Sequence, residues 1–335
     1  MKAPAISILM PVKNYASYLP ACLNSILAQT EIDWELIAVD DHSTDRSLEI
    51  LEAFAKSDSR IRPHTHEGQG LISALRTAFR HSRGYFVTRM DADDLMPPFK
   101  LELLRRALTG PGQIAVGLVR YFANEGSEVG PGYLRYARWL NELTLSGGTY
   151  REIYKECTIP SSAWMCGRED FLAAGAFEPE VYPEDYDLCF RFYRSKLEVI
   201  AVPEIVHLWR DHTRRISRTL PAYADNTFLD LKVSWFLQLD YDASRPLVLY
   251  GAGKKGKRIA ALLRERAIPF HWLCNRPTKW GKSMHGIVWQ APDFLRALQQ
   301  PQIILALADR RGREEVGGLL GLSDREEGKD FFWFA

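Results

Sequence analysis

Short apolar runs alternate with amphipathic helical patterns through the first 90 residues, and this rhythm constrains the fold more than any other feature. The runs that predict strands lie at residues 6–12, 34–39, 61–62 and 85–89. Between them apolar side chains recur at steps of three and four, as at Leu19, Leu23 and Ile26, which is the spacing of a helix with one buried face. Strands that are separated by helices pair in parallel. The sequence therefore predicts an α/β fold, with a mostly parallel sheet covered by helices on both faces.

Three carboxylates crowd together at the end of the fourth apolar run, in the sequence Met90-Asp91-Ala92-Asp93-Asp94. Like charges this close repel each other, and a bound cation relieves the repulsion. Carboxylate oxygens suit Mg²⁺ or Mn²⁺, which also hold substrate phosphates in many proteins. Ligands of open α/β sheets bind outside the carboxyl ends of the strands. The cluster thus predicts a metal–diphosphate site at this edge, with a solvated acidic turn as the alternative.

The length of 335 residues predicts two domains, which we expect at residues 1–240 and 246–335. The formal net charge of +1 gives no argument for a nucleic-acid partner. The five cysteines match no CxxC-type metal or redox motif, which favours a reduced, cytoplasmic setting. No apolar stretch approaches the roughly 20 residues that a membrane span needs.

Five short motifs follow one another in a specific order, although each one alone is weak. They are PVKNY at 11–15, VDDHSTD at 39–45, MDADD at 90–94, PEDYDL at 183–188 and LWRDH at 208–212. Over about residues 5–220 this ordered set resembles a family 2 glycosyltransferase with the nucleotide-sugar-binding GT-A fold. The resemblance implies a metal-dependent, inverting transfer of a sugar from a nucleoside-diphosphate sugar, with UDP as the expected nucleotide. The implied acceptor is a hydroxyl of a saccharide or glycoconjugate in bacterial surface-polysaccharide assembly.

The resemblance also implies a nucleotide pocket. The loop after the first predicted strand would line this pocket through Pro11, Val12, Asn14 and Tyr15. Asp41 would accept a hydrogen bond from the base, with Asp40 beside it, and a helix-capping turn is the alternative. Arg76 and Arg210, or a later serine such as Ser217, would face the phosphates. An exposed helix arginine is the alternative for Arg76.

The acid cluster becomes the metal site under this resemblance. Asp93 would hold the Mn²⁺ or Mg²⁺ that bridges the diphosphate, and Asp91 would reach the ribose or a metal-bound water. His212 would complete the coordination, since a neutral imidazole is a reasonable Mn²⁺ ligand, although a surface histidine is equally expected. Asp94 would orient the site from the side of the sugar or acceptor pocket.

Glu184 and Asp185 resemble the acidic pair that opens a helix near the acceptor. We expect Asp185 to be the general base that deprotonates the acceptor hydroxyl, with Glu184 as its neighbour or as an acceptor contact. A simple helix start is the alternative, because acids favour helix N-termini. Trp164 would stack on a sugar face, with core packing as the alternative.

A second α/β pattern begins near residue 247 and includes a glycine-rich turn, Gly251-Ala252-Gly253-Lys254-Lys255-Gly256. A strand before such a turn and a helix after it are the context of a dinucleotide fingerprint. However, Cys274-Asn275-Arg276 replaces the expected acid, and the two lysines suit an anion. The segment resembles Rossmann-type domains appended to bacterial sugar-biosynthesis enzymes. We expect a degenerate Rossmann-like module used for packing, for assembly into a homo-oligomer or for binding an unidentified anionic ligand.

Two other functions stay open at this point. One is an NAD-dependent sugar-nucleotide oxidoreductase or epimerase that works through the C-terminal module. The other is a non-catalytic nucleotide-sugar-binding protein. The aromatic and basic segment from Tyr133 to Trp139 also leaves open a peripheral contact with a lipid-linked acceptor at the inner face of the plasma membrane. Core packing or an oligomer contact is the alternative for that segment.

Overall fold

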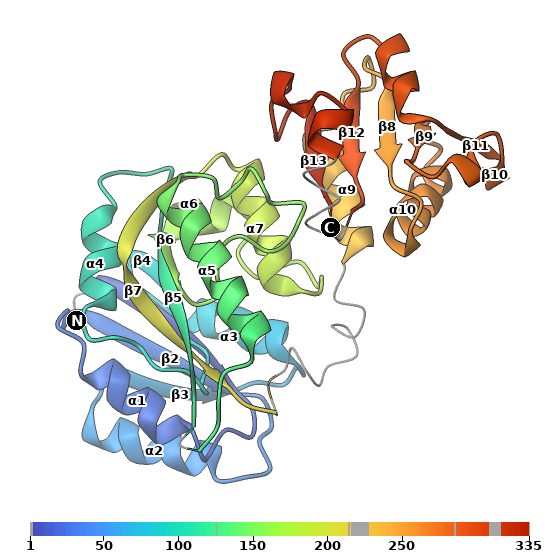
Figure 1. The fold of residues 1–335 in the computed structure, drawn as a ribbon. Coiled ribbons are helices and arrows are strands. Elements are labelled where there is room, and N and C mark those ends of the chain that lie inside the picture. The colour runs from blue at the N-terminus through green and yellow to red at the C-terminus, as the bar shows by residue number, and fades with distance from the viewer. Residues whose placement is uncertain are drawn as a thin grey trace. The chain divides into compact units, whose positions relative to one another are not determined.

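The computed structural model describes residues 3–124, 126–213, 215, 228–284, 286–307 and 316–334. By their contacts, the residues divide into two compact units (Figure 1). The first unit comprises Met1–Thr149 and Thr158–Tyr223, and the second comprises Tyr150–Cys157 and Ala224–Ala335. The expected boundary at residues 240–246 stays a prediction for the domains, whereas the contacts group helix α9 (Leu229–Leu239) with the second unit. Ser217 lies outside the described residues.

The first unit is built on a seven-stranded sheet in the order β3-β2-β1-β4-β6-β5-β7. Its strands are β1 (Ile6–Val12), β2 (Trp34–Asp40), β3 (Ile61–Thr65), β4 (Phe86–Arg89), β5 (Gln113–Ala123), β6 (Trp164–Gly167) and β7 (Glu198–Asp211). β1 pairs in parallel with both β2 and β4, whereas β6 runs antiparallel to β4 and β5. The carboxyl ends of β1, β2 and β4 therefore meet at one edge of a mixed sheet.

Helices cover both faces of this sheet, as the alternation of side chains along β1 shows. The helices are α1 (Leu19–Leu27), α2 (Ser47–Ser57), α3 (Leu71–His81), α4 (Lys100–Ala107), α5 (Pro131–Leu145), α6 (Arg168–Ala173) and α7 (Glu184–Arg194). Ile8 and Met10 belong to a core cluster with residues of α1, α2, α4 and α5. Leu9 points to the opposite face because successive strand residues alternate, and α3 packs against β1 and β2 outside that cluster. The predicted α/β class is confirmed.

The stretch from 110 to 220 contains β5, β6, β7, α5, α6 and α7. β5 pairs with β7 from Gln113 opposite Glu198 to Ala123 opposite Asp211. The register of this pairing shifts around Leu118. A bulge of this kind interrupts the strict alternation of apolar and polar residues by which a strand is recognised in sequence. The sequence signal for these two long strands was therefore weak.

The second unit has a six-stranded sheet in the order β10-β11-β9-β8-β12-β13. Its strands are β8 (Leu247–Tyr250), β9 (His271–Leu273), β10 (Ser283–Met284), β11 (Ile287–Gln290), β12 (Gln302–Leu305) and β13 (Phe331–Trp333), and α10 (Lys254–Glu265) follows β8. All pairs are parallel except that of β10 with β11. The segment 150–157 belongs to this unit, because the Tyr154 ring stacks on Phe334 at 5.2 Å and Lys232 donates a hydrogen bond to the Lys155 carbonyl.

The aromatic stripe of α5 packs inward. Tyr133, Tyr136 and Trp139 are partly buried against the core of the first unit, and Tyr136 lies parallel to the Trp209 ring at 6.3 Å. This packing favours the core alternative over a membrane contact. Among the described residues, no helix is both long and apolar enough to cross a bilayer. The five cysteines are buried.

Candidate functional site

The loops that follow β1 and β2 are bonded to each other. The predicted nucleotide-pocket residues of the first loop lie at the carboxyl end of β1, namely Pro11, Val12, Asn14 and Tyr15. The Asn14 N–H donates to Ser43 Oγ at 2.9 Å, and the Thr44 N–H donates to Asn14 Oδ1 at 2.7 Å. The Ser43 N–H donates to Asp40 Oδ2 at 3.0 Å. Asp40 thus stabilises the turn after β2. The carboxylate of the neighbouring Asp41 makes no such bond within this turn.

Asp41 is buried and accepts hydrogen bonds on both carboxylate oxygens. Lys13 Nζ lies 2.9 Å from Oδ2, while His66 Nε2 and the Gly70 N–H lie 3.1 and 2.9 Å from Oδ1. Burial opposes its charge, but the Lys13 ammonium and the Gly70 N–H together hold the pKa of Asp41 below its usual value. Asp41 is therefore an ionised hydrogen-bond acceptor at neutral pH.

Two histidines that the sequence did not single out complete this corner. The ligand atoms of Asp41, His42 and His66 lie within 4.8 Å of one another. His42 Nε2 is 2.8 Å from the Gly68 carbonyl, and His66 Nδ1 is 3.1 Å from Ser73 Oγ. Since protein partners already hold these atoms, the cluster fits a hydrogen-bonded pocket wall better than a metal site. His66 follows β3 and contacts Asp41 at the end of β2, so no local motif predicts this contact.

Asp93 and His212 lie together, as predicted for a metal pair. Oδ2 of Asp93 is 2.8 Å from Nε2 of His212, both side chains are largely buried, and the Tyr15 ring meets the imidazole edge-on. Burial, followed by the negative charge of Asp94, raises the pKa of Asp93. A carboxylate whose charge is opposed in this way is a favourable place for a cation, and a carboxylate with an imidazole suits Mn²⁺. The residues fit the predicted metal.

Asp91 is bonded elsewhere. Its Oδ1 accepts a hydrogen bond from Arg89 Nε at 2.9 Å, and its Oδ2 accepts from Ser162 Oγ at 3.0 Å and Ser161 Oγ at 3.3 Å. Burial opposes ionisation, yet the Arg89 guanidinium and the Ser162 hydroxyl hold the pKa of Asp91 below its usual value. A metal or ribose role for Asp91 stays a prediction, and its partner Arg89 was not predicted.

Asp94 anchors the end of β7 to the acid cluster. It is 0% exposed, its Oδ1 accepts the Arg210 N–H at 2.7 Å, and its Oδ2 lies 2.9 Å from His207 Nε2. Burial raises the pKa of Asp94 to about 7. Arg210 also donates from Nε to the Asp93 carbonyl at 2.8 Å, so it does lie beside the acids. Asp94 has no exposed surface, and its expected role in orienting the site beside the sugar or acceptor pocket stays a prediction.

Two other predicted residues are held by contacts within the protein, and one of them, Trp164, lines a small hollow together with Arg89 and Asp185. Trp164 is 1% exposed, packs against aromatic rings and donates from Nε1 to the Ser161 carbonyl at 2.8 Å. Its burial favours the core alternative over stacking on a sugar. Arg76 donates to the carbonyls of Phe177 and Glu178 at 3.2 and 2.8 Å. It thus fastens α3 to the loop before α7, and the structure does not bring it to the acid cluster.

The acidic pair Glu184 and Asp185 opens α7, as expected. Glu184 is buried, and its Oε1 accepts a hydrogen bond from Arg89 Nη1 at 2.8 Å. Asp185 lines a hollow of about 10 Å³ together with Arg89 and Ser161. Burial and the neighbouring Glu184 raise the pKa of Asp185 to about 7. An acid with this pKa exchanges a proton readily at neutral pH, which is the property of a general base.

The glycine turn of the second unit has the close packing of a nucleotide-binding turn. Gly251 has a φ of 122°, and a Cβ on Gly256 would lie 2.1 Å from the Gly251 carbonyl oxygen, whereas a Cβ on Gly253 would meet open space. Lys279 Nζ donates to the Ala252 carbonyl at 2.9 Å. Cys274, which is buried, follows β9 where a ribose-binding acid would stand. The identity of this unit as a Rossmann-like module stays a prediction.

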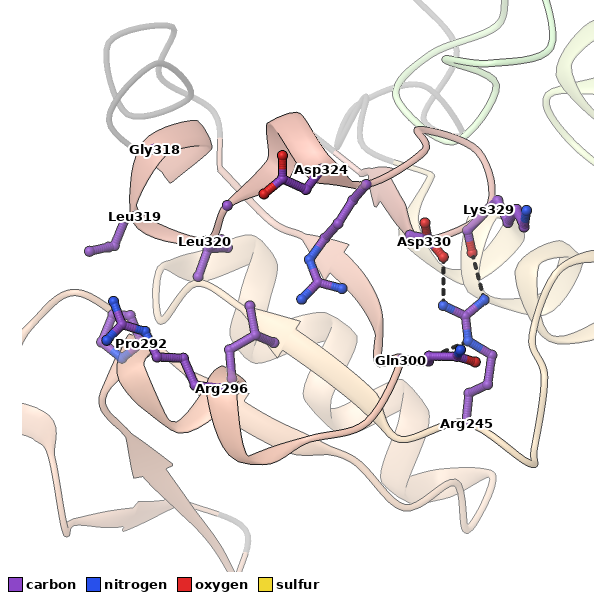
Figure 2. A pocket seen from close by; sticks show the side chains of 13 residues that line it. Arg245, Pro292, Arg296, Gln300, Gly318, Leu319, Leu320, Asp324, Lys329 and Asp330 are labelled. Atoms are coloured by element: carbon purple, nitrogen blue, oxygen red, sulfur yellow. Dashed lines mark hydrogen bonds and ion pairs between the residues drawn. The ribbon is translucent and has the colours of Figure 1, made fainter.

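The second unit also contains a pocket of about 720 Å³ (Figure 2). Arg245 lies at one side of it, where it donates to the Gln300 carbonyl at 2.7 Å and to Asp330 Oδ1 at 2.7 Å. These bonds connect the chain just before β8, β12 and β13, so Arg245 stabilises the sheet. Within the described residues, none of the predicted site residues lines this pocket.

Comparison with known proteins decides the family. Residues 7–172 match the model of the family described as glycosyl transferase family 2. Residues 7–172 are a family 2 glycosyltransferase domain. Members of this family invert the configuration at the anomeric carbon of the sugar.

Curated protein sequences are also similar to parts of this chain. EpsH of Bacillus subtilis is 28% identical over 226 residues, which cover 64% of this chain and 63% of EpsH. A chondroitin synthase of Escherichia coli is 36% identical over 102 residues, which cover 30% of this chain and 15% of the synthase. The matched segments thus span less than two thirds of the length of these relatives.

Solved structures share the fold of the glycosyltransferase domain. S. aureus TarS (residues 1–349), in complex with UDP-GlcNAc, matches with a TM-score of 0.54 at 17% identity over 71% of this chain and 68% of TarS. The mannosyltransferase PcManGT of Pyrobaculum calidifontis, in complex with GDP-Man and Mn²⁺, matches with a TM-score of 0.51 at 19% identity. That match covers 80% of this chain and 70% of PcManGT. These likenesses confirm a GT-A-like sheet.

Proposed function

We propose that this glycosyltransferase moves a sugar from a nucleoside-diphosphate sugar, UDP-linked by preference, to a hydroxyl group of a saccharide or glycoconjugate. One observation carries the proposal. Asp91 of the motif after β4 and Glu184 of the motif that opens α7 bind the same guanidinium, that of Arg89. The acids expected on the donor side and those expected on the acceptor side therefore belong to one connected site.

In the proposed mechanism, Asp185 is the general base. It takes the proton from the acceptor hydroxyl as that oxygen attacks the anomeric carbon of the donor. The bond from the anomeric carbon to the diphosphate oxygen breaks on the opposite face, and the nucleoside diphosphate leaves with the bonding electron pair. Configuration at the anomeric carbon is inverted, in agreement with the family.

Asp93 and His212 would hold the divalent cation, Mn²⁺ or Mg²⁺. When bound, such an ion supplies positive charge that neutralises the departing diphosphate. Asp94, through its bond to the Arg210 N–H, holds the end of β7 near Asp93. Arg210 would add a second positive charge on the phosphate side.

The proposed recognition of the base rests on Asp41. An ionised carboxylate accepts the ring N–H of uracil, and it accepts N–H groups of guanine equally well. TarS with UDP-GlcNAc supports a UDP-sugar, while PcManGT with GDP-Man supports a GDP-sugar as the second donor to test. Relatives named hyaluronan synthase and chondroitin synthase support a saccharide acceptor and a place in polysaccharide synthesis.

The test is a panel of UDP-, GDP- and dTDP-sugars, assayed for binding and slow hydrolysis with and without Mn²⁺. We expect one donor to bind and turn over only with metal, and Asp93→Ala to abolish both. Glu49→Gln, an exposed acid on α2, is the matched control and should behave like the wild type. If no donor is engaged, while NAD(H) binds regardless of Asp93, the proposal fails and the second unit carries the function. Binding without any turnover, in the presence of candidate saccharides, would instead favour a non-catalytic binding protein.

A further inference from the structure

Arg89 is a buried cation at the last position of a short core strand. It is 6% exposed and follows Val87 and Thr88, which are fully buried. A guanidinium in such a place is costly unless it is ion-paired. Arg89 has two carboxylate partners, Asp91 at 2.9 Å and Glu184 at 2.8 Å.

An ion pair of this kind contributes little to stability by itself. Well-packed apolar residues in place of a buried pair are often neutral or stabilising. The geometry that Arg89 fixes is a stronger reason for its presence. The guanidinium joins the loop after β4 to the first turn of α7, and it uses separate nitrogens for Asp91 and Glu184.

Arg89 treats the two neighbouring acids of α7 differently. Glu184 is bonded to Nη1 directly, whereas Asp185 lies on the wall of the small hollow that Arg89 and Ser161 also line. The charged groups that act on Asp185 are Glu184 on its own helix, Arg89 at the end of β4 and Asp91 just beyond. Cys189 of α7 lines the same hollow. Only one of the two acids is thus held in a fixed ion pair.

We propose that Arg89 is a positioning residue that binds Glu184 in a fixed ion pair and thereby reserves Asp185 as the one acid of the pair that receives the acceptor's proton. This inference rests on the proposed function. It assigns Glu184 to the protein framework, so Glu184 does not exchange protons with substrate. The choice between the two acids is made by a residue on a different strand.

The test compares Arg89→Met, Arg89→Lys and Glu184→Gln in the full chain. The first readout is the ¹³C carboxyl titration of Asp185 by NMR, with the signal identified by its loss in Asp185→Asn. Removing the cation should raise the midpoint by about one pH unit, and removing the neighbouring anion should lower it by a similar amount. Arg89→Lys, which keeps the charge, should restore the midpoint to within about half a pH unit. Arg106→Met, an exposed arginine of α4, is the control and should leave the midpoint unchanged.

The second readout is the acidic limb of kcat/KM for donor turnover, which should move with the NMR midpoint in each variant. A merely structural role would lower kcat without moving the limb. Midpoints that stay at the wild-type value in both Arg89→Met and Glu184→Gln would overturn the inference. If Arg89→Met does not fold, Glu184→Gln still decides, because its shift has the opposite sign. The NMR titration needs no substrate, so a failure of the proposed donor chemistry is distinguishable from a failure of this inference.

Discussion

Nε2 of His212 lies 2.8 Å from Oδ2 of Asp93, although the two residues are 119 positions apart in sequence. His212 follows β7, the longest strand of the first sheet, and Asp93 follows β4, one of the shortest. The bonds from Asp94 to the Arg210 N–H and to His207 hold these two chain ends together. The pair is therefore positioned by the backbone around it, before any ligand binds.

This positioning predicts that both members of the pair matter for metal. Asp93→Asn and His212→Ala should each weaken Mn²⁺-dependent binding of UDP at least about tenfold, because the first removes the carboxylate charge and the second the imidazole nitrogen that we propose as metal ligands. Calorimetric titration of UDP with and without Mn²⁺ measures this directly. Unchanged binding in both variants would show that the cation lies elsewhere.

Asp41 should contribute to binding and not to the chemical step. Asp41→Asn removes the negative charge that Lys13 and the Gly70 N–H surround. A hydrogen bond to a charged group contributes about 1.5–3 kcal/mol, so we expect a rise of tenfold or more in KM with kcat nearly constant. Steady-state kinetics on the best donor is the measurement. A fall in kcat at constant KM would contradict this assignment.

Activity should depend on pH through Asp185. Burial and Glu184 raise the pKa of Asp185 to about 7, and a general base works only when it is ionised. We therefore expect kcat/KM to fall about tenfold for each pH unit below roughly 7 and to level off above it. A profile measured between pH 5 and 9 tests this, with the metal concentration kept saturating. A profile that stays flat down to pH 5 would mean that the base is an unperturbed carboxylate.

Trp164 separates packing from sugar binding. Trp164→Ala removes a buried ring from an aromatic cluster and should lower the free energy of unfolding by about 3–5 kcal/mol. Urea unfolding followed by circular dichroism measures the loss. Trp164→Phe should be milder, and its folded fraction should keep the wild-type KM for donor. A variant with normal stability and a raised KM for the donor would show that Trp164 contacts the sugar.

The glycine turn of the second unit offers a matched pair of substitutions. Gly256→Ala forces a Cβ against the Gly251 carbonyl oxygen, so we expect a loss of about 1–3 kcal/mol in stability. Gly253→Ala places its Cβ in open space and should cost less than 1 kcal/mol by comparison. Thermal unfolding of both variants gives the comparison. Equal losses would mean that the close approach of α10 to β8 is not maintained.

Local sequence patterns predicted the elements but not the long-range partners. The run at 6–12 is β1, and the acid cluster does follow β4, because periodicity and turn residues are local properties. In contrast, the pairing of Arg89 with Glu184 joins residues 95 positions apart, and that of His66 with Asp41 joins two different loops. Such partners depend on strand order, which no local pattern specifies. For the same reason, no local pattern shows that the side chains of Asp94 and Trp164 are buried.

The stacking of Tyr154 on Phe334 has a consequence for how the molecule can be assembled. The chain enters the second unit at residues 150–157, returns to the first and enters the second again after residue 223. No single cut of the backbone can therefore separate the two units intact. During synthesis, Tyr154 leaves the ribosome long before Phe334 is made. The segment 150–157 can therefore take its place in the second unit only after the C-terminal strand is synthesised. The order of translation and the order of folding are thus different in this protein.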